Sequence, residues 1–276
     1  MLPFQTVLCA LDFEPGFERA LVQAADLAER AHAALHLVHV NPLFRARLAP
    51  TPGDPGAAFQ ERVERFVNGA LGADDAFGVL APALHETRGQ APADGIVGRA
   101  ADVGADLVVV GTHGRGGLGH LLLGSVAAET LRRSPVPVLV VPDRAEPPGA
   151  GRPVLVAVDD PEPAVAALGF ALATAYGSPV VLGHVCAADD PAERAERRQA
   201  LDRLAAEAAG PTASPHEVRV TQGEPAAEVA AMAERVGAGA VVMGTHGRTG
   251  WDRLRLGSVA ERTVRHVPCP VLAVPV

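Results

Sequence analysis

The chain has 276 residues, a formal net charge of -8 at pH 7 and a pI of about 5.7. Hydrophobic residues make up 48% and charged residues 20%, a balance that indicates a globular protein and excludes a fibre or a disordered tail. All 24 basic residues are arginine and none is lysine, which excludes a Walker A phosphate loop, and the absence of a clustered basic run argues against nucleic-acid binding.

Short β-branched runs alternate along the chain with segments of helical periodicity. This alternation predicts parallel strands joined by crossover helices. In the first half we expect strands at residues 6–11, 34–40, 83–88, 106–111 and 136–141. In the second half we expect them at residues 153–158, 179–185, 217–221, 240–244 and 271–274.

The second half repeats the first. Residues 106–141 match residues 239–274 at a constant offset of 133, with GTHGR and LGSVA common to both. Residues 143–152, rich in proline, glycine and charge, predict a linker with a boundary near Gly149. We therefore expect two domains, 1–146 and 152–276, each an open five-stranded parallel sheet with flanking helices. The proline-rich segment 41–58 predicts a long loop in the first domain alone.

A glycine pattern follows the fourth predicted strand of each half. It reads Gly111-x-x-Gly114, nine residues, then Gly124-Ser125, and it recurs from Gly244. Glycines let the backbone approach an anion, and the free N–H groups of a helix that begins at the serine can donate to phosphate oxygens. The alternative is structural, with glycines that end strands and serines that cap helices. Two copies after corresponding strands favour a phosphate site.

Other residues near these loops have weaker assignments. Asp12 and Asp159 follow the first strands, and they share a crevice with the loops if the first and fourth strands are neighbours. Arg115 and Arg248 could pair with a terminal phosphate. The matching histidines, His113 and His246, lack a second ligand at metal spacing, so no metal site and no catalytic base are predicted.

A dinucleotide fingerprint also occurs by chance in the first loop. Residues 114–119 satisfy G-x-G-x-x-G, but the repeat from Gly247 does not. The fingerprint requires the helix to open at its glycines, whereas here the helix is expected later, at Ser125 or Ser258. A nicotinamide or flavin enzyme is therefore disfavoured.

With its G-x-x-G-x9-G-S loops and an aspartate after the first strand of each half, the chain resembles the universal stress protein family in its tandem, ATP-binding form. The resemblance implies a Rossmann-like fold of the adenine nucleotide α-hydrolase type, with ATP as the ligand. In the first half it implies a site of Asp12, Val40, Gly111, Gly114, Gly124, Ser125 and Val126. In the second half the corresponding residues are Asp159, Val185, Gly244, Gly247, Gly257, Ser258 and Val259.

The chain departs from the family after each aspartate. The family often has small residues there, but this chain reads Asp12-Phe-Glu-Pro and Asp159-Asp-Pro-Glu. Carboxylates near phosphates are unfavourable unless Mg²⁺ intervenes, so the second site, with Glu162, is expected to bind the more weakly. We expect unequal occupancy of the two sites.

The sequence thus predicts an ATP-binding stress or regulatory protein with an unidentified protein partner and, at most, slow ATP hydrolysis. A protein interaction module without nucleotide binding and a genuine ATPase are the alternatives. Three isolated cysteines and the lack of any leader or long apolar run predict a cytoplasmic protein that does not enter a membrane. Proline-bounded last strands suggest that the two halves pair as a pseudo-dimer, with a homodimer of the whole chain left open.

Overall fold

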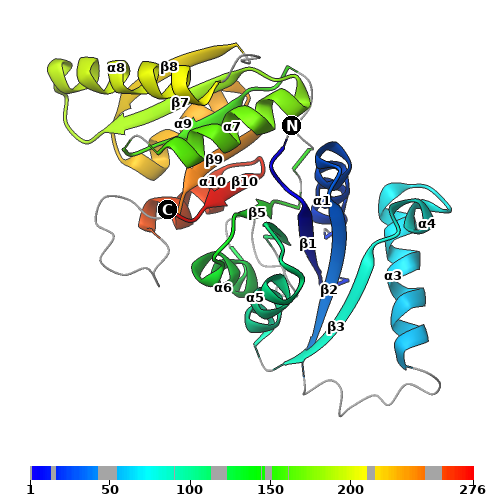
Figure 1. Ribbon diagram of the computed structural model, residues 1–276. Coiled ribbons are helices and arrows are strands. Elements are labelled where there is room, and N and C mark those ends of the chain that lie inside the picture. Colours follow the sequence, from blue (N-terminus) through cyan, green and yellow to red (C-terminus); the bar gives the residue numbers. More distant parts are fainter. Residues whose placement is uncertain are drawn as a thin grey trace. The chain divides into compact units, whose positions relative to one another are not determined.

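The computed structural model describes residues 2–13, 17–42, 55–89, 91–112, 123–143, 145–146, 151–160, 162–209, 215–245 and 257–276. The chain divides into two compact units, Phe4–Asp143 and Arg144–Val276, the latter joined by Met1–Pro3. We call them the first and second halves. Figure 1 shows in each a sheet with helices on its faces.

The first half is a five-stranded parallel sheet with strand order β3-β2-β1-β4-β5. Helices α1 and α3 contact each other, as do α5 and α6, so the helices form two layers. The strands are β1 (Thr6–Leu11), β2 (Ala34–Pro42), β3 (Ala83–Gly89), β4 (Leu107–Gly111) and β5 (Val138–Val141). The helices are α1 (Glu18–Ala31), α3 (Pro55–Leu71), α4 (Ala76–Leu80), α5 (Pro92–Val103) and α6 (Ser125–Arg133).

The second half repeats this topology with strand order β10-β9-β6-β7-β8, again all parallel. Its strands are β6 (Val154–Ala157), β7 (Val180–Cys186), β8 (His216–Gln222), β9 (Ala240–Gly244) and β10 (Val271–Val274). Its helices are α7 (Pro163–Tyr176), α8 (Pro191–Ala208), α9 (Pro225–Val236) and α10 (Ser258–His266). The predicted α/β class with open parallel five-stranded sheets is confirmed.

Apolar runs become the central strands because both faces of a parallel sheet are covered by helices. Every residue of β5, β6 and β10 is buried, and so are the first four residues of β4 and β9. Four predicted strands start too early, and in three of them a proline is the reason. Pro137, Pro153 and Pro179 precede the observed strands because a proline has no N–H to donate to the ladder.

Candidate functional site

The strand order creates a switch point in each half. β1 pairs with β2 on one side and with β4 on the other, and β6 pairs likewise with β7 and β9. Open α/β sheets bind ligands outside the carboxyl ends of the strands at such a point. The predicted adjacency of the first and fourth strands is confirmed, so Asp12 and Gly111 lie at neighbouring strand ends, as do Asp159 and Gly244.

A helix begins beside each of these strand ends. The backbone N–H of Gly124 donates to the carbonyl of Thr112 over 2.6 Å, and the N–H of Gly257 donates to Thr245 over 2.8 Å. These bonds tie the two ends of each glycine-rich loop together. The first backbone N–H groups of α6 and α10, which have no intrahelical acceptor, therefore open next to the ends of β4 and β9.

The helix starts at Ser125 and Ser258 are as predicted, but the capping alternative is wrong. The N-cap residues are Gly124 and Gly257, and neither N-terminus is capped by a side chain. Ser125 and Ser258 stand one position later, at the first helical residue, and both are exposed. Their hydroxyl groups are consequently not committed to a capping hydrogen bond.

A histidine supports the loop after the first strand of each half. Nδ1 of His39 lies 2.7 Å from the carbonyl oxygen of Leu11, and Nδ1 of His184 lies 2.9 Å from that of Val158. A carbonyl only accepts, so Nδ1 is the donor in both rings. The two matched bonds fix the backbone directly before Asp12 and Asp159.

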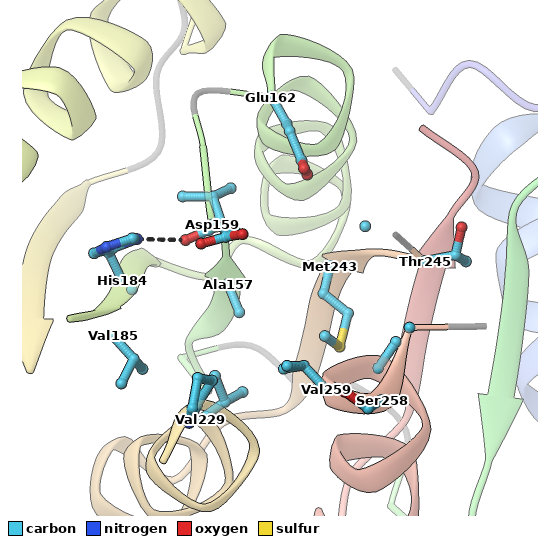
Figure 2. A pocket seen from close by; sticks show the side chains of 16 residues that line it. Ala157, Asp159, Glu162, His184, Val185, Val229, Met243, Thr245, Ser258 and Val259 are labelled. Atoms are coloured by element: carbon cyan, nitrogen blue, oxygen red, sulfur yellow. Dashed lines mark hydrogen bonds between the residues drawn. The ribbon is translucent and has the colours of Figure 1, made fainter. Parts of the chain in front are cut away.

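A cavity of about 420 Å³ lies at the switch point of the second half. It is lined by the ends of β6, β7 and β9 and by the starts of α9 and α10 (Figure 2). All the described residues predicted for this half line it, namely Asp159, Val185, Gly244, Gly257, Ser258 and Val259. The volume is within the usual range for a small-molecule site.

Glu162 is an acid of this cavity with a shifted pKa. It is the residue before α7, and its Oε2 atom lies 2.7 Å from the position that a Cβ on Gly244 would take. Burial, followed by the neighbouring charges of Asp159 and Asp160, raises the pKa of the Glu162 carboxyl to about 7. Near neutral pH, therefore, the carboxyl over the end of β9 is only partly ionised.

The corresponding position of the first half holds an aromatic ring. Phe17, the residue before α1, is only 7% exposed, and its ring atoms lie 3.0 and 3.1 Å from the position of a Cβ on Gly111. The space over the end of β4 is thus filled by a side chain of the same half.

A second aromatic group lies at the same edge, around Phe13. Phe13 has a left-handed φ of 60°, and its ring centroid is 4.9 Å from that of His39 and 5.5 Å from that of Phe66. The guanidinium carbon of Arg62 lies 3.9 Å from the ring centroid. A bulky residue in this conformation costs about 1–2 kcal/mol, and ring and cation contacts of this kind offset such a cost.

The remaining predicted residues fall into two groups. Val40 is buried on β2, where a Cβ on Gly95 of α5 would come within 2.8 Å of its Cγ2 atom. Ser125 and Val126 open α6 beside the end of β4. Outside the described residues lie Gly114, Arg115, Gly247 and Arg248, together with His113 and His246.

Sequence reasoning missed several cavity residues. His184, Thr245, Met243, Pro225 and Val229 line it beside the predicted set. The sequence did offer a signal for the histidine, because His39-Val40 recurs as His184-Val185 at an offset of 145 residues. Glu162 was expected to disfavour phosphate, but its place over Gly244 was not foreseen.

The comparisons with known proteins agree with this architecture. The model of the universal stress protein family matches residues 3–142 and 151–275. The chain belongs to the universal stress protein family. A universal stress protein of Mycolicibacterium smegmatis is 34% identical over 186 residues, which are 62% of each chain, so the chain spans less than two thirds of that relative's length.

Solved structures of the universal stress protein family share the fold. A putative member from Pseudomonas aeruginosa has a TM-score of 0.75 at 18% identity and covers 99% of this chain and 94% of its own. A member from Archaeoglobus fulgidus was solved in complex with dAMP; it covers 45% of this chain and 97% of its own, at 22% identity and a TM-score of 0.38.

Two other kinds of site are absent from the described ranges. No described helix is long and apolar enough to cross a membrane. The same part of the chain contains no group of three or more histidine, cysteine or acidic side chains placed to hold a metal ion.

Proposed function

We propose that this universal stress protein binds ATP in the cavity of its second half. The observation that carries the proposal is the convergence, in one cavity, of a strand-end glycine, an uncapped helix N-terminus and a strand-end aspartate: Gly244, Ser258 and Asp159. The uncapped N–H groups of α10 and the positive end of its dipole favour a phosphate. Asp159 suits ribose hydroxyl groups, because a carboxylate only accepts hydrogen bonds.

The two halves differ in ways that favour the second as the nucleotide site. The Phe17 ring covers Gly111 in the first half, whereas the cavity of the second half includes Gly244. The loop sequences differ too: residues 246–256 contain three arginines and one aspartate, and residues 113–122 contain a single arginine. The second loop thus carries the larger positive charge for a polyphosphate. This assignment reverses the order of affinity expected from the sequence.

In this proposal the protein binds ATP and hydrolyses it slowly or not at all. It would act as a regulatory protein whose nucleotide state alters its contacts with a protein partner. The aromatic groups of the first half favour a second role for that half, as a binding module that takes no nucleotide. Phosphate release from ATP, measured against a blank, tests the first point.

Isothermal titration calorimetry with ATP tests the site directly, and the duplication supplies matched variants. We expect a stoichiometry of one. Ser258→Asp places an anion at the start of α10, which suits the helix dipole but repels phosphate, and it should weaken binding at least tenfold. Ser125→Asp makes the same change at α6 and should leave binding unchanged. Gly257→Val should abolish binding and Gly124→Val should not.

Three outcomes would contradict the proposal. Absence of binding up to millimolar ATP would refute nucleotide binding. A stoichiometry of two would refute the proposal that the first half takes no nucleotide. Loss of binding in Ser125→Asp, with Ser258→Asp intact, would move the site to the first half. Circular dichroism of each variant checks that a loss of binding is not a loss of fold.

A further inference from the structure

The residue that precedes the first helix of each half overhangs the glycine that ends the fourth strand. In the first half this residue is Phe17, over Gly111, and in the second half it is Glu162, over Gly244. Figure 2 shows the Glu162 carboxylate directed from the start of α7 into the cavity. The position is therefore structurally equivalent but chemically opposite: one half places a ring there and the other a titratable acid.

Among the described residues, little around Glu162 compensates the charge of an anion. Asp159 lies in the cavity wall, and Asp160 is held by Arg197 of α8 over 3.0 Å. From β9 and α10 the described lining residues are neutral, including Thr245 and Ser258, and His184 of β7 donates to a backbone carbonyl. No arginine is among the described residues that line the cavity. An ionised Glu162 and a phosphate over Gly244 would repel each other at close range.

We propose that Glu162 is a proton-linked gate of the phosphate subsite, so that a nucleotide enters the space over Gly244 with uptake of a proton by this carboxyl. The inference rests on the proposed function and adds a regulation to it. The proton neutralises the acid that faces the incoming phosphate, and the neutral carboxyl can donate a hydrogen bond to a phosphate oxygen. ATP affinity then depends on pH.

The size of the effect follows from the acid's titration. With a pKa of about 7, Glu162 is mostly protonated at pH 6 and mostly ionised at pH 8. If only the protonated form accepts ATP, affinity falls about tenfold from pH 6 to pH 8, and binding takes up about one proton at pH 8. At pH 6 the uptake by Glu162 is close to zero.

Calorimetric ATP titrations in buffers of different ionisation enthalpy count the protons taken up. ATP itself titrates in this range, so the informative quantity is the difference between the wild type and Glu162→Gln. At pH 8 we expect the wild type to take up about one proton more than Glu162→Gln and to bind about tenfold more weakly, with the difference in affinity gone at pH 6. Glu162 makes no side-chain capping bond to α7, so the substitution removes no cap.

Glu217→Gln is the matched control. It removes one carboxylate from the same half, but the hydrogen bond to Arg219 lowers the pKa of Glu217, which therefore stays ionised from pH 6 to pH 8. It should retain the wild-type proton uptake. Glu162→Ala, which leaves no donor or acceptor at the position, should also lose the uptake.

The outcomes separate this inference from the proposed function. Equal proton uptake by the wild type and Glu162→Gln would show that the carboxylate stays ionised or swings aside, which overturns the gate but leaves ATP binding in place. Failure of all variants to bind ATP at pH 6 would instead overturn the proposed function. Loss of uptake in Glu217→Gln would attribute the effect to net charge and overturn the gate.

Discussion

Gly169 sets the distance between α7 and β6, and its replacement by alanine is the sharpest test of the packing that positions the cavity. A Cβ at Gly169 would lie 2.2 Å from Cγ2 of Val156 and 3.5 Å from its Cβ. Val156 is fully buried and β-branched, so it cannot rotate away freely. Relief to an ordinary contact of about 3.5 Å requires α7 to move away from the sheet by about 1 Å.

We expect Gly169→Ala to destabilise the second half by about 1–2 kcal/mol. Overpacking of a core costs about 1–3 kcal/mol, and the better helix propensity of alanine returns about 0.5–1 kcal/mol.

Urea denaturation followed by far-UV circular dichroism measures the effect. Gly98→Ala, in an exposed position of α5 with nothing within 4 Å of the added Cβ, is the matched control. It should stabilise its half by about 0.5–1 kcal/mol because alanine narrows the unfolded ensemble. If Gly169→Ala is as stable as the wild type, the close approach of α7 to β6 is refuted.

Two further predictions concern pH, and they have opposite signs. Nδ1 of His36 lies 2.9 Å from Nε2 of His85, and burial lowers the pKa of both rings. The folded state therefore binds fewer protons than the unfolded state, and the melting temperature should fall as the pH drops below about 6.5. The fall should be smaller in His36→Gln. The raised pKa of Glu162 does the reverse: stability conferred by the protonated carboxyl is complete below about pH 4.5 and is lost as pH rises through about 7. Glu162→Gln should therefore be the more stable at pH 8, by about 1–2 kcal/mol after allowance for its partial exposure to solvent, and equal melting temperatures there would contradict the assigned burial.

The fold could be predicted from the sequence because the β-branched strand runs and the helical periodicity were clear and occurred in both halves. Strands β1, β9 and β10 have the predicted bounds, since their apolar runs end at an aspartate, at a glycine and before a proline, respectively. The starts of α6 and α10 were also predictable, because a glycine–serine pair precedes an amphipathic run. Prolines displaced three strand starts, an effect of a missing donor that propensity alone underestimates.

The difference between the two halves was not predictable in the same way. Periodicity fixes which face of a helix is buried, but it says little about a residue just before the helix, where the backbone leaves the regular pattern. Phe17 and Glu162 occupy that position. The charge of Glu162 was visible in the sequence. Its burial over Gly244, and hence its raised pKa, depends on how α7 packs on the sheet.

The contrast between Phe17 and Glu162 implies a division of labour between the duplicated halves. Burial of a phenylalanine side chain contributes about 1.5–3 kcal/mol, so the first half is stabilised by filling its own switch point. Glu162 has the opposite effect, because an ionised carboxylate in a partly buried cavity lowers stability. Protonation of Glu162 removes this loss of stability, and under the proposed function the ATP that binds together with the proton stabilises the half further. One ancestral position can therefore supply stability in one copy and a pH-dependent binding site in the other, with the same glycine loop retained in both.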